Sequence, residues 1–147
     1  MAYWLIKSEP DKYSWADMVR DGRTIWDGVR NHSAAINLRA MKIGDRALFY
    51  HSNVGKEVVG IVEIVGEHYI DPRDEAKRFP AVDVAPVETL VQPVTLAAIK
   101  GDPFFADFDL VRLSRLSVAT VGEAHWDRIM TMAGGTGKMT ERAGSSG

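Results

Sequence analysis

The chain of 147 residues contains no cysteine. Disulfides, thiolate zinc sites and cysteine nucleophiles are therefore excluded. The sequence also lacks any apolar run that approaches the roughly 20 residues a membrane-spanning helix needs. The apolar part of the N-terminal segment MAYWLIKSEP is too short, and wrongly flanked, for a secretory signal. From these absences we expect a cytoplasmic protein.

An excess of positive charge is absent as well. The 18 lysines and arginines are outnumbered by 20 aspartates and glutamates, which gives a formal net charge of −2. Proteins that bind many phosphates are usually basic, because counterion release drives that binding. Any nucleic-acid binding by this chain must therefore rely on a local basic face or on a specific pocket. The hydrophobic and charged contents, 46% and 26%, are ordinary for one globular domain of this length.

Motifs for metal binding and catalysis are missing. No histidine has a partner at the i, i+4 spacing of a helical zinc site; the four are His32, His51, His68 and His125. No nucleophile-elbow, Walker or dinucleotide-binding glycine pattern occurs. Glu9 and Asp27 could form an acid–base pair, but we favour the interpretation in which they accept hydrogen bonds from the backbone. We therefore expect no metal, no cofactor and no catalytic activity.

Hydrophobic patterning predicts an α+β domain. Strands are expected at residues 3–9, 24–26, 46–52, 57–69 and 81–90, with a further strand or extended segment at 111–117. Helices are expected at residues 15–22, 33–41, 96–100 and about 121–133. Gly60 and Gly66 lie within the 57–69 run, and glycines inside a strand commonly mark bulges or sharp bends. The sheet should therefore curl into a small mixed barrel or bend strongly.

All four predicted helices begin next to side chains that can cap them, and Thr95 is the cap expected for the helix at residues 96–100. Ser14 with Asp17, and Thr120 with Glu123, have the spacing of a capping box. Ser33 can accept hydrogen bonds from the free N–H groups of a helix that opens at the next residue.

The C-terminal residues show no apolar periodicity, and we expect them to be disordered. No internal repeat and no linker divides the rest of the chain. The sequence thus predicts one domain at residues 1–134 and a disordered tail at residues 135–147. We expect the protein to be a monomer.

The stretch WDGVRNHS at residues 26–33 suits neither the inside of a helix nor that of a strand. Its Asp-Gly pair favours a turn, because Gly28 can adopt a conformation that residues with a Cβ resist. Trp26 precedes the turn, and Arg30 and Asn31 follow it. An aromatic face, a guanidinium and an amide on a tight turn before a helix favour binding of a flat polar ligand. In biology such a ligand is often a nucleobase.

Several short motifs follow one another along the chain: YWLIKSEP at 3–10, YS at 13–14, WDGVRN at 26–31, NLR at 37–39, GD at 44–45, FYHS at 49–52 and RLSV at 115–118. In these motifs the chain resembles the EVE-domain family, and the resemblance runs from about residue 2 to residue 133. It departs from the family at His32 and at residues 34–36, where an aromatic residue, a glutamine and an arginine would be expected.

The resemblance implies a fold similar to the PUA superfamily, with a bent mixed β-barrel flanked by short helices. It also implies a relation to YTH domains, which capture a methylated adenine in an aromatic cage. EVE domains are regarded as readers of modified bases in DNA, with 5-methyl- and 5-hydroxymethylcytosine as the leading candidates, and they carry no established catalytic activity. We therefore expect a nucleic-acid-binding module whose partner is DNA with a modified base.

With this resemblance, the predicted binding residues fall into three groups. Trp26 would stack on the base, and its polar edge would be met by Ser8, Asn31 and the backbone around Gly28 and Val29. Flanking phosphates would be held by Lys7, Arg30, Arg39 and Arg115. The predicted set is completed by Glu9, Asn37, His51, Ser52 and Ser117.

Three alternatives stay open at this point. A PUA-like module could instead read a modified base in RNA. An enzyme could act on a modified nucleotide through Glu9, Asp27 or His51, although no catalytic motif supports it. The same pocket could also serve as a sensor of a small molecule.

Overall fold

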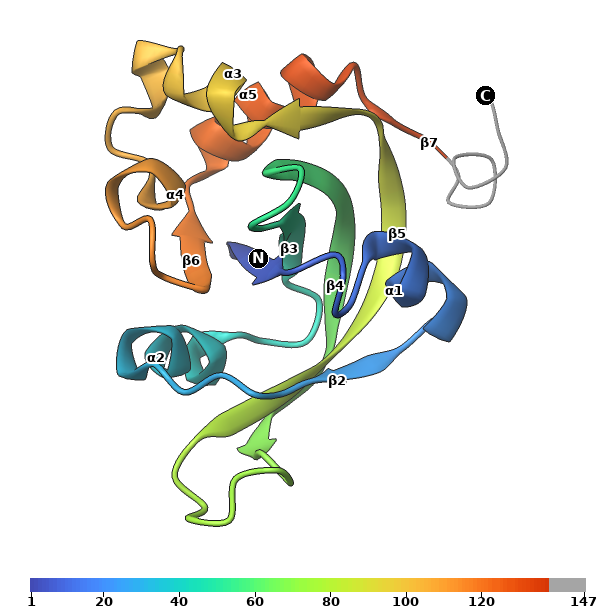
Figure 1. Ribbon diagram of the computed structural model, residues 1–147, viewed down its shortest axis with the longest axis vertical. Helices are drawn as coiled ribbons and strands as arrows, with labels where there is room; N and C mark the ends of the chain where they lie inside the picture. Colours follow the sequence, from blue (N-terminus) through green and yellow to red (C-terminus); the bar gives the residue numbers. More distant parts are fainter. Residues whose placement is uncertain (138–147) are drawn as a thin grey trace.

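The chain forms one mixed sheet with short helices around it in the computed structural model, which describes residues 1–137 (Figure 1). The elements in chain order are β1 (Tyr3–Ser8), α1 (Trp15–Asp21), β2 (Thr24–Trp26), α2 (His32–Ala40), β3 (Arg46–His51), β4 (Glu57–Ile70), β5 (Pro80–Thr95), α3 (Leu96–Lys100), the 3-10 turn η1 (Pro103–Phe105), α4 (Asp109–Arg112), β6 (Val118–Val121), α5 (Glu123–Ala133) and β7 (Thr136–Gly137).

The long antiparallel pair of β4 and β5 forms the centre of the sheet. The strand order is β2-β5-β4-β3-β1-β6, with β7 also paired to β5. Only β1 and β3 are parallel within residues 1–137, and the other pairs are antiparallel. The predicted α+β class with a bent mixed sheet is confirmed. Among the described residues, the strands at the two edges of the sheet, β2 and β6, do not pair with each other. The sheet is therefore bent but open.

The sheet bends where the register between β4 and β5 shifts, including the shifts at Gly60 and Gly66. At Gly60 a Cβ would lie only 2.3 Å from the indole of Trp15. At Gly66 it would lie 2.8 Å from the carboxylate of Asp83. The two glycines thus mark bends, as predicted, and each also lets a neighbouring side chain approach the backbone closely.

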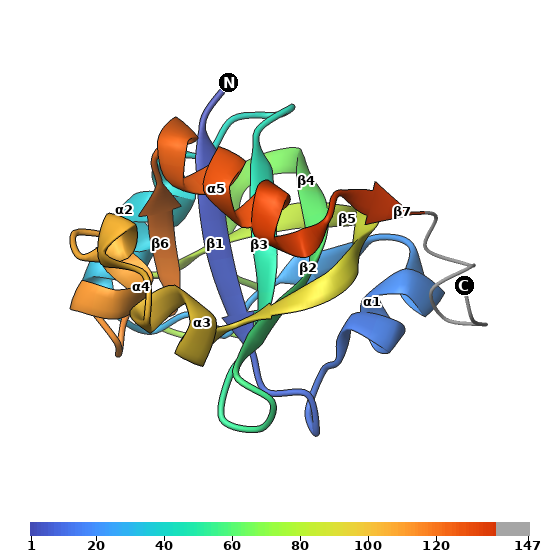
Figure 2. The same cartoon turned by 90° about the horizontal axis from the view of Figure 1, so that it is seen from above.

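Aromatic side chains join the C-terminal elements to the sheet. Trp126 of α5 stacks on Tyr3 of β1, with ring centroids 4.1 Å apart. Phe105 and Phe108 are buried core residues, as predicted, whereas Phe104 is 42% exposed. Figure 2 shows α5 running over the strands from β6 and β1 toward β7. No helix within residues 1–137 is long and apolar enough to cross a membrane.

Helix α2 begins earlier than predicted. Asn31, and not Ser33, is its N-cap: the Asn31 Oδ1 accepts a hydrogen bond from the N–H of Ala34 at 2.9 Å. Asparagine and serine cap about equally well, so the local sequence offered two candidates. By contrast, the predicted capping box of Ser14 and Asp17 at α1 is confirmed.

Two predictions near the C-terminus are wrong. Residues 111–117 were predicted to form a strand or extended segment. Instead, residues 111–112 end α4, in which Arg112 and Asp109 form an i, i+3 ion pair of 2.8 Å, and a turn follows. The capping box of Thr120 and Glu123 does not form, because the Thr120 hydroxyl donates to Asp109 at 2.8 Å and Gly122 is the N-cap of α5.

The predicted tail at residues 135–147 falls mostly outside the described residues. Its first part pairs with the sheet: β7 lies antiparallel to Thr89 and Leu90 of β5. Sheet pairing therefore continues past the predicted domain end at residue 134.

Candidate functional site

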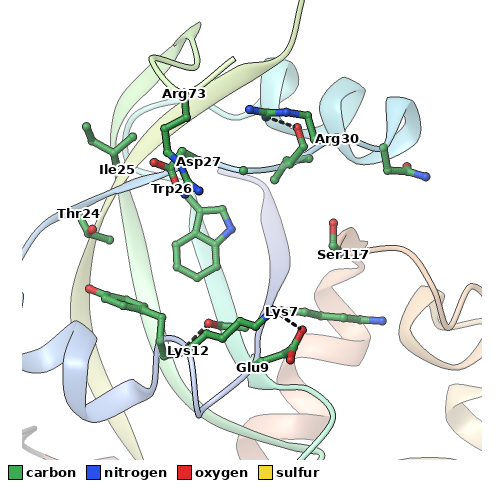
Figure 3. A pocket seen from close by; sticks show the side chains of 15 residues that line it. Lys7, Glu9, Lys12, Thr24, Ile25, Trp26, Asp27, Arg30, Arg73 and Ser117 are labelled. Carbon is green, nitrogen blue, oxygen red and sulfur yellow. Dashed lines mark hydrogen bonds and ion pairs between the residues drawn. The ribbon is translucent and has the colours of Figure 1, made fainter. Parts of the chain in front are cut away.

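An open cleft of about 830 Å³ lies between the end of β1, strand β2 and the turn that follows β2 (Figure 3). Its lining is formed by Lys7, Ser8, Glu9, Lys12, Tyr13, Thr24, Ile25, Trp26, Asp27, Gly28, Val29, Arg30, Asn31, Arg73 and Ser117. Figure 3 shows Trp26 in the middle, with Ser117 on one side and Thr24 and Ile25 on the other. The volume lies within the range of about 300–1,000 Å³ that is typical of small-ligand sites.

The turn after β2 is held by a fully buried carboxylate, that of Asp71. Its Oδ2 accepts hydrogen bonds from the N–H of Gly28 at 2.8 Å and from the Arg30 Nη1 at 2.9 Å. Its Oδ1 accepts from the N–H of Arg73 at 2.7 Å. Gly28 has a φ of 79°, in the left-handed region that favours glycine. One carboxylate thus fixes the turn of residues 27–31 against the loop that leaves β4.

The Asp71–Arg30 pair stays ionised at neutral pH. Burial alone would raise the pKa of Asp71, but the hydrogen bonds from Gly28, Arg30 and Arg73 outweigh it, so the pKa lies below its usual value. In return, the hydrogen bond to Asp71 raises the pKa of Arg30. The positive charge of Arg30 is therefore balanced before any ligand arrives.

Two other cations of the cleft are balanced in the same way. The Arg73 Nη1 lies 3.3 Å from the Asp27 Oδ1, and the Lys12 Nζ lies 3.7 Å from the Glu9 Oε2. The two carboxylates considered as an acid–base pair thus each face a cation. Within residues 1–137, no group of three or more histidines and carboxylates could hold a metal ion.

Lys7 is the exception among the cations of the cleft. Its Nζ donates to the carbonyl oxygen of Ser114 at 2.7 Å, and it has no ion pair within residues 1–137. Burial lowers the pKa of Lys7 below its ordinary value. The ammonium group is therefore a half-buried donor at the edge of the cleft with further N–H groups to offer.

Trp26 is the aromatic centre of the cleft. Its side chain is 9% exposed, and it packs against Tyr13 and Phe49 in edge-to-face arrangements, with centroid distances of 6.3 and 5.6 Å. Figure 3 shows the indole face-on in the middle of the cleft, with its nitrogen toward the side where Ser117 lies. Aromatic packing behind the ring thus holds it in a fixed position.

The indole N–H of Trp26 has no hydrogen-bond partner within residues 1–137. The indole nitrogens of Trp4 and Trp15, in contrast, donate to Asp45 and Thr89, each at 3.0 Å. No fully buried side-chain nitrogen or oxygen lacks a partner in the described part of the chain. The Trp26 nitrogen must therefore reach solvent, and the cleft is the open space beside it. It is a rigidly held donor without an acceptor.

The cleft brings together nine of the predicted binding residues: Lys7, Ser8, Glu9, Trp26, Gly28, Val29, Arg30, Asn31 and Ser117. Two of their uncharged polar side chains are already engaged. The Ser8 hydroxyl donates to the carbonyl oxygen of Tyr13 at 2.6 Å, and the Asn31 oxygen caps α2. The amide nitrogen of Asn31 remains the part that a ligand can use.

The other predicted residues lie outside the cleft; they are Asn37, Arg39, His51, Ser52 and Arg115. Asn37 and His51 tie helices to the sheet. The Asn37 amide donates to the carbonyl oxygen of Val118 at 2.7 Å, and the His51 Nε2 accepts from the N–H of Trp15 at 2.9 Å. Burial lowers the pKa of His51, which favours the neutral form that can accept. These contacts tie α2 to β6 and α1 to β3.

Sequence reasoning missed several lining residues as ligand contacts: Lys12, Tyr13, Thr24, Ile25, Asp27 and Arg73. Thr24 and Ile25 precede Trp26 on the edge strand β2, so the position of Trp26 could have suggested them. Arg73 and its neighbour Asp71 had no such signal. They approach the turn only because β2 pairs with β5 near the loop that joins β4 to β5.

The chain matches the EVE domain family over residues 2–132. Human thymocyte nuclear protein 1 is 39% identical, over 89% of this chain and 73% of the human protein. The NMR structure of a Rhodopseudomonas palustris protein is 49% identical, with a TM-score of 0.87 over 91% of this chain and 94% of that one. A crystal structure of human THYN1 in complex with DNA containing 5-methylcytosine has a TM-score of 0.82 at 29% identity, over 90% and 98% of the two chains.

Proposed function

The chain belongs to the EVE domain family, and we propose that it is a non-catalytic nucleic-acid-binding module whose cleft holds a modified base of DNA. The proposed bases are 5-methylcytosine and 5-hydroxymethylcytosine. The human relative was crystallised with DNA that contains 5-methylcytosine, and this supports DNA as the partner class.

The proposal depends most on one observation, the free indole N–H of Trp26 (unpartnered within residues 1–137) beside an aromatic face in the cleft. A base that leaves the duplex loses its stacking and its hydrogen bonds, and the pocket must replace both. The indole face can replace the stacking, which is worth about 1–3 kcal/mol per base. Its N–H can donate to a carbonyl oxygen or a ring nitrogen of the base. One immobile side chain thus offers both interactions.

Polar groups around Trp26 suit the edge of a cytosine. That edge carries an amino donor together with carbonyl and ring-nitrogen acceptors. The Ser117 hydroxyl can donate and accept, and the Asn31 amide nitrogen can donate. Glu9, whose side chain is 39% exposed, can accept from the amino group. Hydrogen-bond donors and acceptors therefore line the same space.

The charge balance of the cleft also favours a base over a phosphate. Arg30, Arg73 and Lys12 are each paired with a carboxylate. A phosphate would have to compete with those carboxylates, whereas a neutral base would not. The methyl group contributes modestly, because one methyl in such a pocket is worth about 1–3 kcal/mol. We therefore expect the affinity for the modified base to exceed that for cytosine by a factor of about 10 to 200.

The test is a binding titration with short duplexes that contain cytosine, 5-methylcytosine or 5-hydroxymethylcytosine, with methylated RNA as a competitor. The variants are Trp26→Ala, which removes face and donor, and Trp26→Phe, which keeps a face and removes the N–H. Trp126→Phe is the matched control, because Trp126 lies in the core against Tyr3 and outside the cleft. Thermal melting checks that each variant is folded.

We expect a modified duplex to bind more tightly than the unmodified one. Trp26→Ala should abolish the preference and Trp26→Phe should weaken binding, while Trp126→Phe binds as wild type does. Equal binding of all duplexes, or unchanged binding by folded Trp26→Ala, would contradict the proposal. Displacement of DNA by methylated RNA at lower concentration would replace DNA by RNA as the partner.

A further inference from the structure

A second hollow of about 350 Å³, here called the hairpin hollow, lies where β4 turns into β5. It is lined by Arg39, His68, Tyr69, Ile70, Lys77, Arg78, Phe79 and Pro80. Figure 1 places this turn at one end of the molecule, beside α2 and beyond β2. Three cations and a histidine line the hollow, and among the described residues no carboxylate does.

The cations of the hairpin hollow are unpaired, which distinguishes them from those of the cleft. Within residues 1–137, neither Arg39 nor Lys77 nor Arg78 forms an ion pair, whereas Arg30, Arg73 and Lys12 all do. An Arg39 N–H group donates to the carbonyl oxygen of Arg78 at 2.9 Å, which holds the Arg39 guanidinium beside the backbone of the loop.

The carboxylate of Asp74, in the loop between β4 and β5, is turned toward the loop backbone. Asp74 accepts hydrogen bonds from the backbone N–H groups of Ala76, Arg78 and Phe79 at 3.1, 2.8 and 2.7 Å. These bonds hold the loop in a tight turn in which Lys77 has a φ of 58°. Asp74 thus orders the loop through its backbone, and the side chains of Lys77 and Arg78 are exposed.

The hairpin hollow adjoins the cleft through Phe79. The guanidinium carbons of Arg30 and Arg78 lie 5.5 and 6.0 Å from the centre of the Phe79 ring. The carbonyl oxygen of Phe79 also accepts from the N–H of Asp71 at 2.9 Å, the residue that fixes the cleft turn. A ligand that lies across Arg30 can therefore extend from one site to the other.

We propose that the hairpin hollow binds backbone phosphates of the DNA whose modified base occupies the cleft, and this rests on the proposed function. A chain with a net charge of −2 needs a local group of uncompensated cations to bind a polyanion. Arg39, Lys77 and Arg78 form such a group. The cleft then reads the base, and the hollow supplies the sequence-independent attraction.

The test is the salt dependence of duplex binding. Lys77→Gln removes one charge from the hollow, and Lys100→Gln is its matched control, because Lys100 is exposed, unpaired within residues 1–137, and lies on α3 at the other end of the molecule (Figure 1). The double variant Lys77→Gln/Arg78→Gln enlarges the effect. Titrations at several salt concentrations use duplexes with 5-methylcytosine and with cytosine.

We expect the slope of log K against log salt concentration to become less steep, by about 0.9 for each phosphate contact removed. Lys77→Gln and the double variant should show this, with a several-fold weaker binding to both duplexes, and Lys100→Gln should not. The preference for the modified base should be unchanged. The free nucleoside 5-methyl-2′-deoxycytidine, which carries no phosphate, should bind the double variant and the wild type equally.

Three results would overturn the inference. If the wild type discriminates the modified duplex while Lys77→Gln and the double variant keep its full salt slope, the hollow does not bind phosphates, although the proposed function stands. If the double variant loses base preference or binding of 5-methyl-2′-deoxycytidine, the hollow acts on the base itself and not on the flanking backbone. If the wild type binds no duplex at all, the result overturns the proposed function, and with it this inference.

Discussion

Replacing Asp71 by asparagine should destabilise the protein far more than its position at the start of a loop would suggest. The Asp71 side chain has no exposed surface, and it accepts from Gly28, Arg30 and Arg73. In an Asp71→Asn variant, an NH₂ group must replace one oxygen. At Oδ2 it would face two donors, and at Oδ1 it would face the N–H of Arg73. Neither orientation of the amide can satisfy all three donors.

The magnitude follows from the exposure of the partners. Removing one member of a fully buried ion pair costs about 3–5 kcal/mol. The Arg30 side chain is 39% exposed, so water can rehydrate it in part, and we expect a loss of about 3 kcal/mol. Asp27→Asn is the matched control, because Asp27 faces Arg73 in an exposed pair at 3.3 Å. Such pairs contribute less than about 1 kcal/mol.

Urea unfolding at neutral pH measures both variants, and a second series in acid tests the cause. The folded-state pKa of Asp71 lies below its ordinary value, so in acid the unfolded chain binds more protons than the folded one. The stabilisation is therefore complete above the unfolded-state pKa of about 3.9 and is lost as pH falls through the folded-state pKa. The gap between wild type and Asp71→Asn should shrink in acid. Equal losses for Asp71→Asn and Asp27→Asn, or a gap that widens in acid, would refute this reasoning.

Three further substitutions test the packing and capping by urea unfolding. Gly60→Ala should lower the free energy of unfolding by about 1–3 kcal/mol or more, because the new methyl would overlap the Trp15 ring. An unchanged free energy of unfolding would contradict the close packing of Trp15 on this bend. Thr89→Val should cost about 1–3 kcal/mol, because it leaves the buried indole N–H of Trp15 without its acceptor, and a Trp15→Phe background should remove most of that loss. Asn31→Ala should cost about 1 kcal/mol and Ser33→Ala much less, because only Asn31 caps α2; the reverse order would return the cap to Ser33.

The features that sequence could predict are those set by neighbours along the chain. The capping box of Ser14 and Asp17 needs only its own spacing, and it forms. Gly60 and Gly66 stand out because they interrupt a β-branched run, and both lie at shifts in register. The turn after Trp26 is predictable for the same reason, because an Asp-Gly pair needs no distant partner to favour a turn.

The features that sequence could not predict depend on contacts between distant segments. Thr120 has the spacing of a cap, but a hydrogen bond to Asp109 takes its hydroxyl. Asn37 was predicted as a ligand contact, and its amide donates to the carbonyl oxygen of Val118, 81 residues away along the chain. Asp71 carries no local signal at all, although it fixes the turn that the sequence singled out. Each of these side chains acts through a partner that only the folded sheet brings near.

The contrast between paired and unpaired cations separates two contributions to DNA binding. Within residues 1–137, the cations at the cleft are balanced by carboxylates, apart from Lys7, and those at the hairpin hollow are not. Binding through the hollow should weaken as salt rises, because counterion release drives it. Stacking and hydrogen bonding at Trp26 should respond little to salt. The ratio of Kd for unmodified and modified duplexes should therefore stay constant over a salt series in which both Kd values rise. A ratio that collapses at high salt would mean that charge also takes part in base reading, and Lys7 would then be the residue to replace.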